Sequence, residues 1–355
     1  MAAHAGRLAA QLRFRPLAGL RSLLSGTSTP ATLRQRLRAW RHGFSATTWL
    51  LFELDRRSPA DYVPDVKAGA MAAIDGPVAR AVLRNKLLFE RVVGRLVRVP
   101  RVLAVHERGV VTALQPGWEA EDALGIVDRV LETGQGVVAK PADSSEGRDV
   151  HTVEAGDGRL LLDKRPAGRE EAARAIAGEG TLITELVRQG GYAGSVFPGS
   201  LNTLRVVTMV DPEDGEPFVV SAIHRFGTSR SAPTDNVSRG GVRCVVDVET
   251  GRLSAGKANW VLEDGRFVEL EAHPDTGARL AGTVVERWPD VVATLLGVVR
   301  RLPFLVYVGW DVAVTEDGLV VVEGNHSPNI TQQVAGPYLA DPRVRRVLRH
   351  HGVVA

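Results

Sequence analysis

The chain has 355 residues, of which 44% are hydrophobic, and its formal net charge is +3. This length allows two modest domains, or one domain with subdomains, each with a buried apolar core. The single cysteine, Cys244, excludes an internal disulfide framework, and no run of about eighteen apolar residues offers a membrane span. We therefore expect a globular, soluble, cytoplasmic protein in which Cys244 is a small core residue rather than a nucleophile.

The beginning of the chain is rich in arginine and free of acidic residues. Eight arginines precede Glu53, the first acidic residue, so the rest of the chain has a net charge of −5. Such a start is typical of a transit-like leader, or of a surface helix that contacts anionic lipid or RNA, but a solvated lead-in is the simpler interpretation. We expect residues 1–30 to be a disordered basic lead. The basic N-terminus as a whole is expected to make at most weak peripheral membrane contact, and the protein is expected to have no specific nucleic-acid partner.

Helical patterns dominate residues 31–96. The segments 31–44 and 47–57 predict short helices, the first of them mostly basic. The strongest pattern covers residues 75–96 and predicts one helix, with Asp75 as a plausible cap and Pro77 in the first turn. This part of the chain is therefore expected to form a helical N-terminal region.

From about residue 97 the sequence changes to short β-rich runs separated by turns. Helical intervals are expected at 120–132 and 168–177, and residues 283–302 predict a long amphipathic helix that is broken or entered at Pro289. Residues 304–325 predict two strands joined by the turn "TEDG". The layout indicates an α+β protein with an antiparallel sheet domain. The expected strands lie within 99–106, 109–114, 134–141, 180–187, 201–210, 217–227 and 241–248.

The last predicted hairpin carries two carboxylates and an amide. We expect Asp311 to begin one strand and Glu323 to end its partner, so that both lie at the same end of the ladder, with Asn325 on the same side. Carboxylate and amide oxygens suit a hard cation such as Mg²⁺, whereas an ordinary solvent-facing hairpin end is the alternative. His326 is not expected to bind metal, because Mg²⁺ prefers oxygen and no second histidine has zinc-like spacing.

A lysine and a small-residue loop form a second candidate. Lys140 ends an apolar run, and Ser144, Ser145 and Gly147 follow it. A lysine beside a loop with free backbone N–H groups is typical of phosphate binding, although the spacing of a P-loop is missing and such a loop is often only a connector.

Basic residues in 197–241 form a third candidate. Arg205 lies inside an apolar run, where burial would require an anion, although an edge arginine that reaches water is an equal alternative. Arg225 precedes a long polar loop that contains Asn236 and ends in two glycines. This loop is typical of a clamp or lid for an anionic ligand, or of a plain connector.

Taken in order, these motifs resemble the ATP-grasp superfamily of carboxylate-amine ligases, and most of all its sugar-transfer associated branch, which is related to the α-L-glutamate ligases. The resemblance extends from about residue 40 to 348. It implies an ATP-grasp fold, in which two α+β subdomains clasp ATP, with a helical N-terminal extension. The expected subdomains are 97–187 and 188–348, followed by a tail at 349–355. The motifs are Lys86 in "RNKLLFE", Lys140 with its loop, "TLITELV", "LNTLR", "DNVSRGG", and Asp311 with "EGN".

The resemblance also implies roles for single residues. Lys86 and Lys140 correspond to the nucleotide lysines. Arg205 corresponds to the arginine that reaches the transferred phosphate, and Arg225 and Asn236 to the residues that hold the acyl phosphate and acceptor. The remaining positions are the phosphate-covering loop with Ser144, Ser145 and Gly147, the adenine-binding hinge with Glu185 and Val187, and the magnesium triad Asp311, Glu323 and Asn325, usually a two-ion site that also accepts Mn²⁺.

The function implied by this resemblance is an ATP- and Mg²⁺-dependent ligase that forms an amide or peptide bond through an acyl phosphate. Its substrates would be small-molecule, glycan or peptide carboxylates and amines, for example in surface-glycan or natural-product biosynthesis. A phosphotransferase on the same fold and a non-catalytic nucleotide-binding protein are the alternatives. One departure from the family's pattern concerns the substrate, because the N-terminal third is helical and Arg-rich where many ATP-grasp ligases have a Rossmann-like domain.

Overall fold

The computed structural model describes residues 31–142, 150–156, 159–263 and 266–355. The predicted basic lead (1–30) and three predicted phosphate-loop residues, Ser144, Ser145 and Gly147, lie outside these ranges. No helix within the described ranges combines the length and the apolar character needed to cross a membrane.

The N-terminal region is helical, as predicted. Thr32 and Ser45 are the N-caps of the first two helices, and their side-chain oxygens accept hydrogen bonds from backbone N–H groups in the first turn. The second of these helices ends at Leu51, earlier than the predicted segment 47–57. The helices of this region are α3 (Leu33–Arg41), α4 (Ala46–Leu51), α5 (Ala68–Ala72), α6 (Pro77–Arg84) and α7 (Lys86–Val93).

The single helix predicted over 75–96 is wrong, because the chain forms two helices there. Asn85 lies between them in an extended conformation, and its side-chain oxygen accepts the N–H groups of Leu87 and Leu88 at 3.0 Å each. An asparagine at this position offers the backbone an alternative to helical hydrogen bonds. The break places Lys86 in the first turn of α7.

Asp75 is also not the N-cap that the sequence predicted. Gly76 occupies that position, and Pro77 is the first helical residue, as expected. The Asp75 carboxylate instead accepts the backbone N–H groups of Val306 and Tyr307 at 3.1 and 3.0 Å. Burial raises the pKa of Asp75 to about 6. Asp75 therefore attaches the N-terminal region to the strand that carries Asp311.

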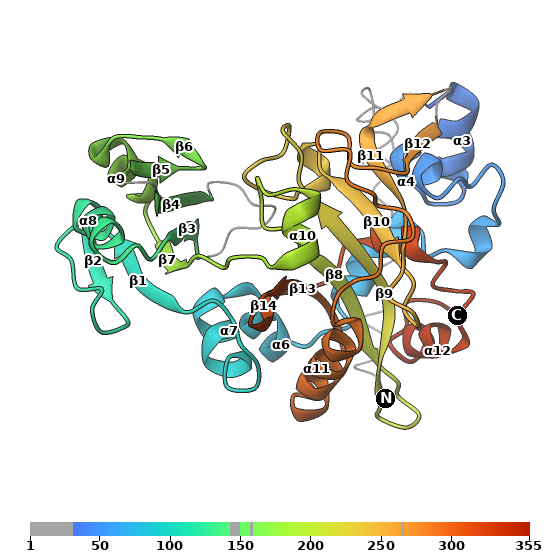
Figure 1. Ribbon diagram of the computed structural model, residues 1–355. Helices are drawn as coiled ribbons and strands as arrows, with labels where there is room; N and C mark the ends of the chain where they lie inside the picture. Colours follow the sequence, from blue (N-terminus) through green and yellow to red (C-terminus); the bar gives the residue numbers. More distant parts are fainter. Residues whose placement is uncertain (1–30, 143–149, 157–158, 264–265) are drawn as a thin grey trace.

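Within the described ranges, fourteen strands form two antiparallel sheets of seven strands each. The first sheet has the order β2-β1-β7-β3-β4-β5-β6, and α8 (Ala123–Thr133) and α9 (Arg169–Ile176) pack against β4 and each other. Figure 1 shows this sheet and its two helices at one end of the molecule. Its strands are β1 (Val102–Glu107), β2 (Val110–Ala113), β3 (Val137–Pro141), β4 (His151–Gly156), β5 (Arg159–Leu162), β6 (Arg165–Pro166) and β7 (Thr181–Glu185).

The second sheet has the order β12-β11-β10-β9-β8-β13-β14. Helix α4 contacts β12 at one edge of this sheet, and α6 and α7 contact β14 at the other; Figure 1 shows α3 and α4 beside β11 and β12. The strands are β8 (Leu204–Val210), β9 (Pro217–Phe226), β10 (Val242–Val246), β11 (Leu253–Glu263), β12 (Arg266–Leu270), β13 (Tyr307–Thr315) and β14 (Gly318–His326), and the remaining helices are α10 (Gly191–Val196), α11 (Trp288–Arg301) and α12 (Pro342–His350).

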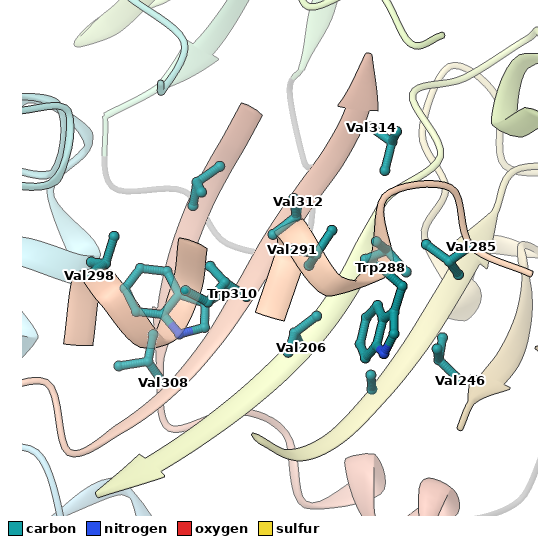
Figure 2. Packing of buried hydrophobic residues seen from close by; sticks show 14 of the residues in the cluster. Val206, Val246, Val285, Trp288, Val291, Val298, Val308, Trp310, Val312 and Val314 are labelled. Atoms are coloured by element: carbon teal, nitrogen blue, oxygen red, sulfur yellow. The ribbon is translucent and has the colours of Figure 1, made fainter. Parts of the chain in front are cut away.

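The main core lies between α11 and one face of the second sheet. Figure 2 shows Trp288 and Val291 of α11 close to Val206 of β8 and to Val312 of β13. Helix α11 begins at Trp288, so Pro289 marks its entry and does not break it. Cys244 is fully buried in the same core, which confirms its prediction as a core residue.

Candidate active site

A cleft of about 1290 Å³ is lined by residues of both sheets and of the N-terminal helices. The structure brings into it every predicted site residue that lies within the described ranges. These residues are Lys86, Lys140, Glu185, Val187, Arg205, Arg225, Asn236, Asp311, Glu323 and Asn325.

The alternation of side chains along the strands explains why charged residues gather on one face of the second sheet. On β13, the residues Trp310 and Val312 belong to the core under α11, so Asp311 between them points to the opposite face. Arg205 on β8 lies between two core residues, and Arg225 on β9 lies between the buried His224 and the core residue Phe226. The apolar face therefore binds the helix, and the charged face lines the cleft.

Asp311 is bound by two arginines. The Nη2 atoms of Arg205 and Arg225 lie 2.9 and 3.0 Å from its Oδ2, and Nε of Arg205 donates to its Oδ1. Burial alone would raise the pKa of Asp311, but the two guanidinium groups outweigh it and hold the pKa below its ordinary value. The alternative of an edge arginine is wrong for Arg205, because β8 lies between β9 and β13 and the side chain is only 11% exposed.

Asp235 is a second buried acid beside Arg225, and the sequence did not indicate its role. Its Oδ2 accepts the backbone N–H of Thr203 at 2.9 Å, and Nε of Arg225 lies 3.4 Å from the same oxygen. Asp235 thus ties the polar loop to the start of β8. The only sequence signal was its place beside Asn236 in "DNVSRGG".

The same loop turns sharply at its two glycines. Gly240 has a φ of +115°, and a Cβ on Gly241 would lie 2.6 Å from the Asp235 carbonyl oxygen. Asn236 lines the cleft, but its Oδ1 accepts hydrogen bonds from the backbone N–H and hydroxyl of Ser238 at 2.9 Å each. Its side-chain oxygen therefore shapes the loop in this structure.

Glu323 lies directly opposite Asp311 in the strand register, with Asn325 two residues further along β14. Asp311 is in the middle of β13 and Glu323 is inside β14, so the prediction that one begins its strand and the other ends its partner is wrong. The ladder extends on both sides of this pair, from Val308 opposite His326 to Thr315 opposite Gly318. Nδ2 of Asn325 donates to Oε1 of Glu323 at 3.2 Å. Burial raises the pKa of Glu323, and the negative charge of the facing Asp311 carboxylate raises it further.

The side-chain oxygens of Glu323 and Asn325 could bind a magnesium ion, whereas those of Asp311 are less available. Glu323 forms no ion pair with an arginine or lysine of the described chain, and the Asn325 amide oxygen accepts no hydrogen bond there. Both oxygens of Asp311 are engaged by arginines. Counting only His, Cys, Asp and Glu, no group of three in the described ranges could hold a metal. The site thus matches Mg²⁺ that keeps water and phosphate ligands beside one or two protein oxygens.

Two lysines reach the cleft, Lys86 from α7 and Lys140 from β3 of the first sheet. Lys86 donates from Nζ to the carbonyls of Pro141, the last residue of β3, and of Ala142, at 3.3 Å each. Burial lowers the pKa of Lys140 to about 8, and Lys86 adds to this effect while Glu323 opposes it. Within the described residues, the Lys140 ammonium forms no ion pair. Its charge is therefore available to a phosphate group.

The predicted adenine-binding hinge follows β7. The carboxylate of Glu185 pairs with Arg101 at 3.0 Å, and the N–H of Leu186 donates to the Gly136 carbonyl. Among backbone hydrogen bonds of the described residues, none uses the Val187 N–H as donor. This group lies at the cleft wall, where a purine ring could accept its hydrogen bond.

Comparison with protein families gives one match. The family model described as "Sugar-transfer associated ATP-grasp" matches residues 74–349. No curated protein matches the chain by sequence.

Several solved structures are weakly similar. D-alanyl-alanine synthetase A from Vibrio cholerae has 12% identity and a TM-score of 0.42, with 78% of this chain and 63% of that chain covered. L-amino acid ligase from Bacillus licheniformis has 12% identity and a TM-score of 0.40, with 77% and 48% covered. D-cycloserine synthetase DcsG has 16% identity and a TM-score of 0.41, with 87% and 82% covered. The chain thus spans less than two thirds of the first two proteins, and such weak similarity says nothing about its substrate.

Proposed function

The chain belongs to the sugar-transfer associated ATP-grasp family, as the order of its motifs predicted, and from this premise we propose that it is an ATP- and Mg²⁺-dependent ligase that joins a carboxylate to an amine. The observation that carries the proposal is the charged face of the second sheet. There Arg205 and Arg225 lie beside the opposed carboxylates Asp311 and Glu323, and Lys140 reaches the same cleft from the first sheet. Such a site suits a triphosphate and a second anion.

The proposed reaction has two steps. The γ-phosphoryl group of ATP is transferred to a carboxylate oxygen of the substrate, and the bond to ADP breaks. An amine then attacks the acyl carbon, phosphate leaves, and the amine loses a proton to water. Lys140, Arg205 and Arg225 hold and screen the phosphate and carboxylate oxygens during both steps. Mg²⁺ held by Glu323 and Asn325, with Asp311 as a further candidate ligand, would supply positive charge to the phosphates.

A product assay tests the proposal. Purified protein is incubated with MgATP and pairs of carboxylates and amines, and ADP, phosphate and the amide are measured. A ligase releases ADP and phosphate only when both substrates are present. A stable phosphorylated product without free phosphate would support the phosphotransferase alternative. Nucleotide binding with no turnover for any pair would support the non-catalytic alternative.

Nucleotide affinity should fall as the pH rises, because Lys140 loses its proton near pH 8. We expect the Kd for MgADP, measured by calorimetry, to rise between pH 7 and pH 9.5. Lys140→Arg should remove this dependence, since the guanidinium stays charged. Lys140→Ala should weaken binding about tenfold or more at pH 7, the loss of a charge-assisted hydrogen bond.

The opposite pH dependence is expected for stability. Between about pH 8 and pH 10.5, the unfolded chain keeps the Lys140 proton that the folded chain has lost, so this group makes the free energy of unfolding rise with pH.

For nucleotide binding, a Kd for MgADP that does not change with pH in the wild type would place the phosphates away from Lys140.

We also propose that α3 contacts an anionic membrane surface. Leu33, Leu37 and Trp40 lie at helical spacing and are 73%, 52% and 54% exposed, among the arginines of the same helix. Trp40→Glu should lower cosedimentation with phosphatidylserine vesicles about tenfold, which corresponds to the burial of one apolar side chain. Leu131→Glu on α8, also exposed, is the control and should have no effect. Equal cosedimentation of the two variants would contradict the proposal.

A further inference from the structure

Arg243 is a buried charged residue of the cleft that has no part in the proposed reaction. Arg243 on β10 lies directly opposite Arg225 on β9. Its neighbours Val242 and Cys244 are in the core, so its side chain points to the charged face, where it lines the cleft. The residue is 7% exposed.

Arg225, Arg243 and Lys257 lie side by side on the neighbouring strands β9, β10 and β11. The two cations on either side of Arg243 have acidic partners. Arg225 is paired with Asp235 and Asp311, as described above. On the far side of Arg243, Lys257 of β11 is opposite it in register and pairs with Glu53 at 3.1 Å and Glu269 at 3.5 Å. These cations are therefore compensated within the protein itself.

Among the residues that the structure describes, no acid compensates Arg243. Its Nη1 donates to the Asn259 amide oxygen at 2.8 Å, and its guanidinium lies 5.6 Å from the ring centroid of Phe267. Within the described ranges it forms no ion pair with an acid, and its buried Nε and Nη2 have no hydrogen-bond partner. Burial lowers the pKa of Arg243 to about 10. Nε and Nη2 form one edge of the guanidinium, which is the edge that binds a carboxylate or phosphate through two parallel hydrogen bonds.

A second unsatisfied group lies on the same side of the cleft. Gln332 belongs to the 3-10 helix η4 (Ile330–Ala335), which contacts β10 and α4. Its side chain is buried, it lines the cleft, and its Oε1 has no donor among the described residues. Unsatisfied buried donors and an unsatisfied buried acceptor beside one cleft indicate a polar ligand that supplies both partners. Thr47 and Leu51 of α4 line the cleft as well.

We propose that Arg243, supported by Asn259 and Gln332, binds a second anionic group of the carboxylate substrate, a carboxylate or a phosphate that does not react. This inference rests on the proposed ligase function. Neighbouring strands are about 4.8 Å apart, so this group lies roughly one strand spacing beyond the reacting carboxylate at Arg225. Gln332 accepts a hydrogen bond from a hydroxyl or ammonium group of the same molecule. The helical N-terminal region, through α4, thus forms a wall of the substrate subsite.

Thermal unfolding in the presence of saturating MgADP tests this subsite, because the nucleotide then covers the phosphate-binding residues. Glutarate serves as the carboxylate probe and glucose 6-phosphate as the phosphate probe, each against KCl of equal ionic strength. One of the probes should raise the Tm of the wild type in a concentration-dependent manner. Arg243→Met should need at least a tenfold higher probe concentration for the same rise. Arg301→Met, on an exposed arginine at the end of α11 and away from the cleft, is the matched control and should behave like the wild type.

The outcomes separate this inference from the proposed function. An equal response of the wild type and Arg243→Met, or no response of the wild type to either probe, overturns the subsite. If Arg243→Met does not fold, Arg243→Lys replaces it; this variant keeps the charge but loses the two-bond edge, and it should respond more weakly than the wild type. If MgADP raises the Tm of no variant, the nucleotide part of the proposed function fails, while the probe response still decides the role of Arg243.

Discussion

Glu323→Gln is expected to lower the rate of ATP consumption by at least about 100-fold, the size of effect seen when one preorganised electrostatic partner is removed from an active site. The substitution keeps the shape of the side chain and removes the charge that would bind Mg²⁺. It should also weaken binding of MgATP, which calorimetry at limiting Mg²⁺ would measure. The fold should be retained, because the change removes the repulsion between Glu323 and Asp311 that raises the pKa of Glu323.

The matched control for this variant is Glu132→Gln. Glu132 is an exposed glutamate on α8 that pairs with Arg129, one turn away on the same helix. Its substitution should leave ATP consumption unchanged. If Glu323→Gln kept the wild-type rate at limiting Mg²⁺ while remaining folded, the assignment of Glu323 as a metal ligand would be wrong.

Asp311→Asn is expected to lower the free energy of unfolding by about 3–5 kcal/mol, because it leaves Arg205 and Arg225 buried without their shared anion. Denaturant unfolding, with the m-value checked for two-state behaviour, measures this loss. The sign of the pH dependence follows from the lowered pKa of Asp311. Its contribution to stability is present above the ordinary pKa of an aspartate and is lost as the pH falls toward the folded-state value.

A surface ion pair provides the comparison. Asp290 pairs with Arg287 at 3.6 Å, and its side chain is 62% exposed. Asp290→Asn should change the free energy of unfolding by no more than about 0.5 kcal/mol. A loss in Asp311→Asn that is as small as this would show that the buried arginines do not depend on Asp311.

The strands that form the charged face could largely be predicted from the sequence. The runs around Arg205 and Arg225 are mostly apolar and rich in β-branched residues, and both runs became central strands with one face in the core. The break at Asn85 and the role of Asp75 could not be predicted in this way. Asn85 competes locally with a strong helical pattern, and Asp75 binds backbone groups 231 and 232 residues away.

The burial of Arg243 in the cleft could not be predicted from the sequence either. It lies in the predicted run 241–248, where an arginine between apolar residues would equally suit an exposed edge strand. Only the placement of β11 beyond it, and of α4 and η4 around it, makes it a buried cation in a cleft.

The sequence by itself determined the family and the α+β class, because motif order and the pattern of helical and β-rich runs are local properties of the chain. It also predicted which residues would bind a nucleotide, and that remains a prediction. Only the tertiary structure decided which charges compensate one another. Asp311 meets Arg205 and Arg225 because strand order and register bring together residues up to 106 positions apart. Whether a buried charge is paired depends on these distant contacts, and this decides which cations remain available to a ligand.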